Sequence, residues 1–519
     1  MSSLPVSACG RIPPLLVLFF VACVVSTGCN CGGSGKGFQS DGGGGTQLGN
    51  PDAGAGETSR FPDGGCIGVQ CKQVNCPAGK STDLSGYVYA PNGTLPLYNA
   101  LVYVPTTAVQ PFPAGIHCDR CGAGISGSPL VITLTDATGA FTLKNVPVGS
   151  GIPLVYQIGK WRRQVSIPSV APCVTTPLTS VDLQRLPRNK SEGDIPHIAI
   201  ATGGLDAMDC LLRKVGVDTA EFTNPDGAGR VHLYTENGNF VPPNSPPASS
   251  LWSDGGTLAQ YDVVLLPCEG TPNAKPDAGI QNIVDYSSAG GRVFASHFSF
   301  VWMVNPADNP FASAAIWTPD DFSTNKPPSP SPFQIDRSFP KGQAFSAWLS
   351  NVTALDGGAL FVTEPRADVA SVSTGTTRWV YTDNNPTNSS PAVEQLTFNT
   401  PLHPAAQADG GPGLQCGRVV FSDFHVVSAQ APGPFPDSCG ASTDLSPQEK
   451  ALVFMLFDMS SCIQRDTLTP SVCQALSESC GSGSGCCSGL ACLNTSTAAA
   501  CSAQDSSCVC GIDPNASTP

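Results

Sequence analysis

The segment from Asp194 to Phe300 constrains the fold of this chain more than any other. It contains three short apolar runs, at His197–Ala201, Tyr261–Pro267 and Gly291–His297. The first run leads into a helical pattern at Leu205–Val215, and a second helical pattern precedes the third run. Short apolar runs that alternate with amphipathic helices predict an α/β domain with a doubly wound parallel sheet.

The N-terminal residues predict export. Arg11 precedes an apolar run, Leu15–Val25, which suits a signal peptide and is too short to span a bilayer. The small residues that end in Gly28-Cys29 predict a lipobox, in which Cys29 carries the lipid; cleavage at an ordinary signal site nearby is the alternative. We therefore expect a signal peptide over residues 1–28 and a glycine-rich tether over residues 29–65.

These features predict a protein anchored by lipid to the cell envelope, at the outer membrane or the cell surface, so the membrane is its first expected partner. The chain has a net charge of −14 and no long basic run, and therefore lacks the electrostatic signature of nucleic-acid binding. A glycan or a protein remains as a candidate ligand. No cofactor is expected.

Cysteine usage supports export. Of 23 cysteines, Cys9 and Cys23 leave with the signal peptide and Cys29 carries lipid, and removing these three leaves an even number. In an oxidising compartment an even set predicts disulfides. The cysteines assigned to disulfides are Cys66, Cys71, Cys76, Cys118, Cys121, Cys173, Cys473, Cys480, Cys486, Cys487, Cys492, Cys501, Cys508 and Cys510.

Residues 66–190 predict a β-sandwich, because alternating apolar residues and turn signals recur at short intervals. The patterns S-G-x-V-x-x-P-x-G, V-x-V-P and T-D-x-x-G-x-F-x-L-x-x-V-P-x-G lie within Leu84–Leu186. Together they resemble a carboxypeptidase regulatory-like domain, which implies a small prealbumin-like sandwich that supports, spaces or binds. For Cys118 and Cys121, a CxxC pair in an insertion, we favour a disulfide-pinned loop with Cys173 or the Cys66 group over a zinc or redox site.

Three motifs carry a second resemblance. They are D-V-V-L-L-P-x-x-G at Asp262–Gly270, G-G-R-V-F-x-S-H at Gly290–His297 and G-R-V-V-F-S-D-F-H at Gly417–His425. They resemble the class I glutamine-amidotransferase-like fold, especially its ThuA-like branch. The resemblance implies a flavodoxin-like sheet over residues 191–462, with an insertion at about residues 301–358. The Pro- and Ser-rich residues 305–344 within it are expected to be irregular.

Ligands of doubly wound sheets bind beyond the carboxyl ends of the strands. That rule gathers Asp206, Glu269, Ser296 and His297 around one crevice, with Asp206 and Glu269 as candidate ligand-binding residues. The glycine turn at Gly203-Gly204 is not a complete phosphate-binding motif, and tight packing explains it as well.

Catalytic members of the resembling family place a nucleophile on a sharp strand-to-helix turn flanked by small residues. The corresponding stretch here, Ala295–Ser299, has no cysteine and has Phe298 where a glycine would relieve crowding. We therefore expect a non-catalytic domain. The alternative is a degenerate hydrolase triad of Ser296 with Asp423 and His425.

A metal site is the other option considered for the strand ends. His297 and His425, with Glu269 or Asp423, could hold one ion, but no helical HxxxH spacing exists, so structural histidines and no metal are expected. Catalytic use of Cys268 is disfavoured in an oxidising compartment. For Cys268 and Cys210 we expect a disulfide, either with each other or with Cys416, Cys439 or Cys462.

Residues 463–519 predict a small disulfide-rich module. Eight cysteines lie between Cys473 and Cys510 in a segment too short to fold on an apolar core. The C-x6-C-x5-C-C spacing resembles a cystine-knot or dickkopf-type module. Four internal disulfides would use all eight, and their connectivity is not readable from spacing.

The sequence therefore predicts a multidomain protein: a prealbumin-like β-sandwich, a flavodoxin-like α/β domain and a disulfide-rich module. In this order and with this N-terminus, the chain resembles secreted lipoproteins of the myxobacterial type. The expected function is a binding or structural role at the cell surface. The alternative is a secreted hydrolase that acts on a saccharide, ester or amide at the strand-end crevice.

Overall fold

The computed structural model describes residues 66, 68–121, 125–237, 243–319, 325–407, 413–426, 435–440, 444–476, 479–480, 485–487, 490–494, 501 and 508–512. All of them lie within Thr58–Pro519, which forms one unit by its contacts. The predicted signal peptide, Cys29 and the tether lie outside the described residues. Within the described part of the chain, none of the helices has the length and apolar character needed to cross a membrane.

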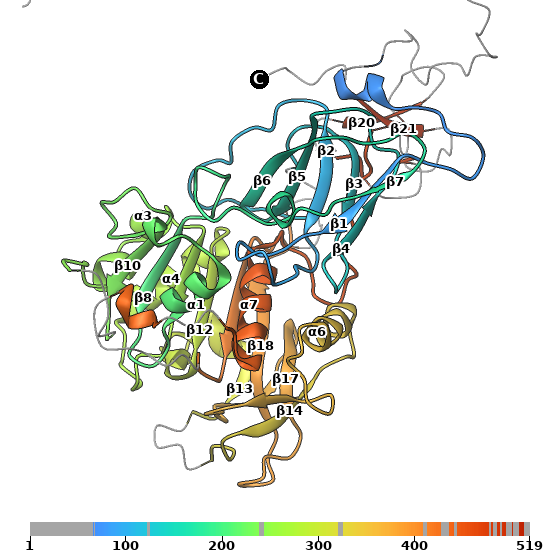
Figure 1. Cartoon of the computed structure of the whole chain (residues 1–519). Coiled ribbons are helices and arrows are strands. Elements are labelled where there is room, and N and C mark those ends of the chain that lie inside the picture. The colour runs from blue at the N-terminus through green and yellow to red at the C-terminus, as the bar shows by residue number, and fades with distance from the viewer. Residues whose placement is uncertain are drawn as a thin grey trace, which may run out of the picture. The chain divides into compact units, whose positions relative to one another are not determined.

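Seven strands near the N-terminus form two sheets (Figure 1). One has the order β4-β1-β7, formed by Ala140–Leu143, Asp83–Tyr87 and Thr175–Pro177. The other has the order β3-β2-β5-β6, formed by Pro129–Leu134, Leu101–Pro105, Ile152–Ile158 and Trp161–Ile167. Leu84 and Phe141 of the first sheet share one apolar core with Val102 and Tyr156 of the second. The four-stranded sheet is also covered on its other face, where Tyr103 and Val155 share a second core with Cys473 and Cys487.

A ten-stranded sheet with the order β15-β14-β17-β18-β19-β12-β11-β8-β10-β9 forms the centre of the α/β region. The strands from β19 to β9 run parallel: Gly417–Ser422, Arg292–Ser296, Val263–Leu266, Ile198–Thr202, Val231–Thr235 and Phe222–Thr223. The others are antiparallel to their neighbours: Leu360–Val362, Ser331–Ile335, Thr376–Thr382 and Ala392–Thr400. The sheet is therefore mixed, whereas the sequence predicts a parallel one.

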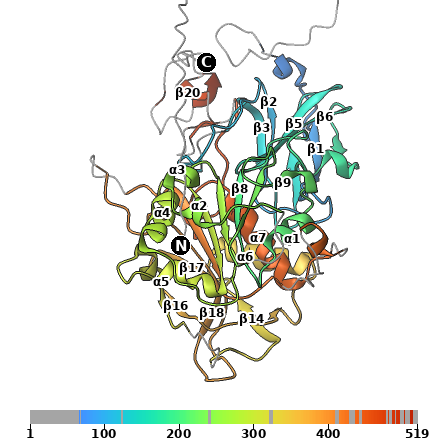
Figure 2. The ribbon, with the colours of Figure 1, turned by 90° about the vertical axis from the view of Figure 1, so that its left-hand side faces the viewer.

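Alternate residues of the parallel strands enter two separate cores, as the period of two requires. Ile198 and Ile200 of β8 share a core with helices α1 and α7, and Ala199 and Ala201 share the other with α4. Figure 2 shows α2 and α4 on one side of the sheet and α1 and α7 on the other. The helices are α1 Met208–Val215, α2 Ser249–Trp252, α3 Gly255–Leu258, α4 Asp277–Ser288, α5 Val301–Val304, α6 Pro340–Asn351 and α7 Pro447–Ser460. Short 3-10 turns lie at Gly68–Lys72, Val181–Leu183, Thr219–Glu221, His297–Phe300, Pro310–Ala314 and Asp437–Cys439.

The described part of residues 305–344, expected to be irregular, contains strand β13 (Ala315–Trp317), strand β14 and the start of α6. Strand β14 pairs with β15 and β17, and its residues alternate between buried and exposed. Its prolines and serines conceal this pattern in the sequence. Strand formation here depends on the pairing partners more than on local propensity.

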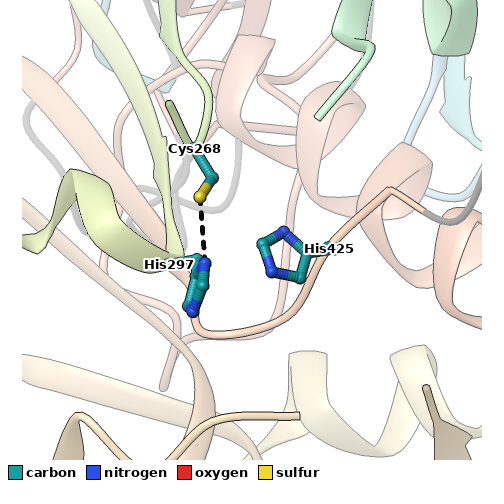
Figure 3. Close-up of side chains that lie close together, drawn as sticks. All are labelled: Cys268, His297 and His425. Carbon is teal, nitrogen blue, oxygen red and sulfur yellow. Dashed lines mark hydrogen bonds between the residues drawn. The ribbon is translucent and has the colours of Figure 1, made fainter. Parts of the chain in front are cut away.

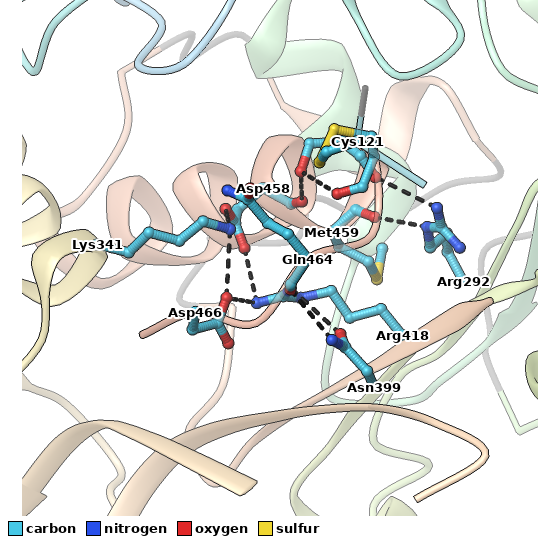
Figure 4. The surroundings of a disulfide bond; sticks show 11 residues. Cys121, Arg292, Lys341, Asn399, Arg418, Asp458, Met459, Gln464 and Asp466 are labelled. Carbon is cyan, nitrogen blue, oxygen red and sulfur yellow. Dashed lines mark hydrogen bonds and ion pairs between the residues drawn. A yellow bond between two sulfur atoms is a disulfide. The ribbon is translucent and has the colours of Figure 1, made fainter. Parts of the chain in front are cut away.

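The N-terminal sheets pack directly on the α/β region. Trp161 of β6 lies 5.7 Å from the ring of Phe457 in α7, and the indole of Trp348 in α6 donates a 2.8 Å hydrogen bond to the carbonyl of Pro96. Two disulfides, Cys118–Cys416 and Cys121–Cys462, join the CxxC loop to the α/β region, and Figure 4 shows the surroundings of Cys121. The pairing of this loop with Cys173 or the Cys66 group is thus wrong. Those cysteines form the disulfides Cys76–Cys173 and Cys66–Cys71.

The C-terminal region is disulfide-rich, as predicted. Its eight cysteines form four internal disulfides: Cys473–Cys487, Cys480–Cys492, Cys486–Cys510 and Cys501–Cys508. Strands β20 (Leu490–Asn494) and β21 (Cys508–Ile512) of this region pair with each other in antiparallel fashion. Burial of cysteine sulfur replaces the apolar core that so short a segment cannot supply.

Candidate functional site

Four parallel strands, β8, β11, β12 and β19, end at the same edge of the sheet, as the crevice rule requires. The residues that follow them supply a cluster of polar side chains. Asp206 follows β8, Cys268 follows β11, Ser296 ends β12 with His297 next to it, and His425 follows β19. Hydrogen bonds, one of them donated by the backbone N–H of Cys268, join these five residues into one cluster.

Asp206 is the hub of the cluster, and its carboxylate is almost completely buried. Its Oδ2 accepts a 2.6 Å hydrogen bond from Ser296 Oγ, and its Oδ1 accepts bonds from the backbone N–H of Val426 at 2.7 Å and from His425 Nδ1 at 3.1 Å. A carboxylate accepts hydrogen bonds, so this contact places the proton of neutral His425 on Nδ1. The lone pair of Nε2 is then free.

Cys268 and His297 form a thiol–imidazole pair, with Sγ 2.9 Å from Nδ1 (Figure 3). Burial and the nearby carboxylate of Asp206 raise the pKa of the Cys268 thiol, and burial together with His425 and Arg366 lowers the pKa of His297. Both shifts keep the proton on sulfur. The pair is therefore a neutral thiol that donates to a neutral imidazole, not a thiolate–imidazolium ion pair.

His297 occupies the sharp turn from β12 into a 3-10 helix, with φ at +49°. This left-handed conformation is unusual for a residue other than glycine. The ring centroid of His297 lies 4.1 Å from the ring centroids of Phe298 and of His425. Cys268 follows the neighbouring strand, β11.

The glycine turn after β8 is explained by packing. A Cβ on Gly203 would lie 2.2 Å from the carbonyl oxygen of Cys268, which is far inside van der Waals contact. Glycine therefore lets the turn approach the end of β11 closely enough for Asp206 to reach the cluster. No phosphate-binding role is needed to account for it.

Two predicted site residues lie outside the cluster. Glu269 pairs with Lys275 at 2.6 Å and accepts a hydrogen bond from Asn273 at 2.9 Å. Asp423 is buried beside Asp368, whose backbone N–H donates a 2.8 Å hydrogen bond to it, and burial and the charge of Asp368 raise its pKa. The structure thus brings together Asp206, Ser296, His297 and His425, and it separates Asp423 from Ser296.

Cys268 is the residue that sequence reasoning missed. It is the one free cysteine among the described residues, because Cys210 bonds Cys439, and Cys416 and Cys462 bond the CxxC loop. The expectation of a disulfide at Cys268 is therefore wrong. The signal available in the sequence was its place directly after an apolar strand, in register with His297 after the next one.

The cluster does not have the connectivity of a serine hydrolase. Catalysis requires an imidazole between the hydroxyl and the carboxylate, whereas here the carboxylate of Asp206 lies between Ser296 and His425. Ser296 Oγ also accepts from the backbone N–H of Cys268 at 3.0 Å. Among the described residues, no imidazole hydrogen-bonds Ser296, so its hydroxyl acts as a structural link.

A separate cavity of about 270 Å³ lies where the CxxC loop, β5 and the residues before Cys473 meet. Phe112, Arg162 and Val472 line it, and the Arg162 guanidinium lies 4.0 Å from the centre of the Phe112 ring. None of the residues of the strand-end cluster lines this cavity. The cluster of polar side chains at the strand ends and this cavity therefore lie in different parts of the molecule.

Comparisons with known proteins were made for the whole chain. Neither a protein-family description nor a curated protein matches it. Among solved structures, a cytoplasmic protein from Salmonella typhimurium is 11% identical and covers 51% of this chain and 99% of its own, with a TM-score of 0.27. A ThuA-like protein from Bacteroides uniformis is 11% identical and covers 50% of this chain and 88% of its own, with a TM-score of 0.25.

A cohesin–X-dockerin complex from Acetivibrio cellulolyticus is also similar. It is 16% identical and covers 24% of this chain and 78% of its own, with a TM-score of 0.14. At these TM-scores the similarities carry no argument about function. The case for a function depends on the geometry of the cluster.

Proposed function

We propose that this chain is an exported, lipid-anchored protein of the cell envelope whose α/β domain binds a ligand and does not turn over a substrate. In this proposal Cys29 carries the lipid and residues 29–65 are the tether. The N-terminal sheets form a carboxypeptidase regulatory-like module, and the α/β region belongs to the ThuA-like branch of the glutamine-amidotransferase-like fold. The order of parts is that of a myxobacterial-type secreted lipoprotein, displayed at the outer membrane or cell surface.

The observation that carries the binding role is the position of Asp206. By holding Ser296 on one oxygen and His425 on the other, it leaves the serine without a base and fixes the histidine in one orientation. The nine disulfides of the described residues support export, because such a set is typical of oxidising compartments and rare in reducing ones.

One observation favours a second candidate, a thiol hydrolase. The 2.9 Å contact between Cys268 and His297, at the turn where related folds carry their nucleophile, has the spacing of a nucleophile and its base. The raised pKa of the thiol argues against it, because the thiolate is the reactive form.

Hydrolysis of ester, amide and glycoside substrates by the full chain distinguishes these functions. We expect no turnover above background, and identical traces for the wild type, Ser296→Ala and Cys268→Ala. Turnover lost in Cys268→Ala and kept in Ser296→Ala would establish the thiol hydrolase. Palmitate labelling tests the anchor: we expect label in the wild type and none in Cys29→Ala, and an unlabelled wild type would refute the lipobox.

A further inference from the structure

Three side chains that can each donate a lone pair to a metal ion lie close together at the strand ends. One ligand atom each from Cys268, His297 and His425 lies within 4.8 Å of the other two. Figure 3 shows the His425 ring turned toward His297 and the thiol. The three residues follow three adjacent parallel strands, so the sheet itself sets their spacing.

We propose that Cys268, His297 and His425 form a mononuclear site for a divalent ion of the Zn²⁺ class. One thiolate and two imidazoles are the donors that borderline transition metals prefer, and they exclude Ca²⁺ and Mg²⁺, which require oxygen. The site would make a divalent metal ion the ligand of the proposed binding function. Its biological role rests on that proposed function, whereas its geometry does not.

The hydrogen bonds around His425 are those of a metal-ligating histidine. Such a histidine usually donates its second ring N–H to a carboxylate, which fixes the tautomer and aims the other nitrogen at the metal. Asp206 accepts from Nδ1 at 3.1 Å, and Gln448 holds the backbone of the same residue by donating to its carbonyl at 2.7 Å. Nε2 therefore keeps the lone pair that a metal needs.

Charge balance favours a divalent ion. On binding, the Cys268 thiol gives up its proton to solvent and forms a sulfur–metal bond, so a 2+ ion with one thiolate carries one net positive charge. The carboxylate of Asp206, which is buried and hydrogen-bonded to both Ser296 and His425, balances this positive charge. A monovalent ion would leave that carboxylate uncompensated.

For the pair of Cys268 and His297, metal binding requires only a small adjustment of the geometry. In tetrahedral coordination a sulfur and a nitrogen ligand lie about 3.5 Å apart, whereas Sγ and Nδ1 are now 2.9 Å apart across a hydrogen bond. Three protein ligands leave a fourth position for water or a small ligand. Of the three side chains, His425 is the one that is partly exposed. The metal ion and its fourth ligand would therefore enter and leave on the side of His425.

The other metal-type groupings in the described residues do not compete. Cys480, Cys486, Cys492, Cys501 and Cys508 are all disulfide-bonded, as are Cys210 and Cys439 beside Asp209. A sulfur in a disulfide has no thiolate to offer. Among these groupings, only the Cys268 cluster has a free thiol.

The test uses the full, exported chain, stripped with a chelator and titrated with Zn²⁺ and with Co²⁺. We expect one ion per chain by elemental analysis, a sulfur-to-cobalt charge-transfer band in the near ultraviolet, and protection of Cys268 from alkylation by bound Zn²⁺. Cys268→Ser and His425→Gln should lose more than about 100-fold in affinity, and Asp206→Asn about 10- to 100-fold. The matched control is His403→Gln, since His403 is exposed and bonds only Ser313 among the described residues; its affinity should equal that of the wild type.

Several outcomes would overturn the site. These are no binding by the wild type, equal binding by Cys268→Ser, or bound cobalt without the charge-transfer band. The alkylation readout needs no variant, so misfolding of a variant cannot hide the answer. Failure of metal binding would leave the non-catalytic proposal standing, whereas metal-dependent hydrolysis would remove that proposal and keep the site.

Discussion

Replacing Lys341 by methionine should destabilise the α/β region by about 3–5 kcal/mol, the usual cost of breaking a buried ion pair. Lys341 of α6 is completely buried, with Nζ 2.7 Å from Asp458 and 3.2 Å from Asp466 (Figure 4). Arg418 of β19 contacts the same two carboxylates. Two cations and two carboxylates cancel, so the methionine leaves one uncompensated negative charge inside the protein.

The magnitude follows from these distances. At an effective dielectric constant of about 20, the contacts of Lys341 at 2.7 Å and 3.2 Å are worth about 6 and about 5 kcal/mol before desolvation. Desolvation of the ammonium offsets part of this attraction. Although burial alone would raise it, the charges of Arg418 and Lys341 hold the pKa of Asp466 below its usual range. Arg418, the stronger of the two, remains in the variant, so that carboxylate should stay charged there.

Urea unfolding followed by tryptophan fluorescence measures the effect. Adding Asp458→Asn to Lys341→Met restores charge balance, so the double variant should be more stable than the sum of the two single costs predicts, with a coupling of about 0.5–3 kcal/mol. The matched control is Lys326→Met, whose ion pair with Glu364 is exposed and should cost at most about 1 kcal/mol. Equal costs for the two lysines, or strictly additive costs in the cycle, would refute the reasoning.

Three further predictions follow from other parts of the fold. Burial and the charge of neighbouring Asp423 raise the pKa of Glu394, so the folded chain holds a proton that the unfolded chain releases. This group should lower stability above about pH 4.5 by up to about 1.4 kcal/mol per pH unit. Glu394→Gln should reduce this slope in melting curves from pH 5 to 8, and the raised pKa of Asp423 should leave a remainder. Replacing Cys121 and Cys462 by serine opens a loop of about 50 residues while Cys118–Cys416 stays closed, which should cost about 4 kcal/mol; unchanged unfolding under oxidising conditions would contradict this. Gly203→Ala should push back the backbone at Cys268 and speed the alkylation of its thiol in the chelator-stripped chain, and an alkylation rate equal to that of the stripped wild type would show that the turn tolerates a side chain.

Local signals in the sequence were sufficient for several features of the fold. Ser446, Pro447 and Glu449 predict the start of α7, and the structure has the reciprocal capping box there. The apolar runs at β8, β11 and β12 are strands, because each is buried on both faces of the sheet. The crowded C-terminal cysteines pair among themselves, since a short segment leaves them few other partners.

Features set by distant contacts could not be read from the sequence. Cys118 and Cys121 pair with cysteines 298 and 341 residues away, and nothing in the CxxC spacing encodes those partners. Asp423 lies only two residues before His425, yet it is buried beside Asp368 and Glu394, because the chain at the end of β19 directs it away from the crevice. Cys268 could be assigned only after the other described cysteines were seen to be paired.

The glycine turn and Asp206 together form the structural basis of our proposal that the strand ends bind a ligand without turning it over. Gly203 brings the turn against the backbone of Cys268, and this contact places Asp206 within reach of both Ser296 and His425. The carboxylate of Asp206 thereby occupies the position beside Ser296 that the imidazole of a catalytic triad would need. It also orients the ring of His425 so that Nε2 can donate its lone pair to a metal ion. The polar residues that suggest a hydrolase in the sequence therefore have an order in space that differs from a catalytic triad and matches the proposed metal site.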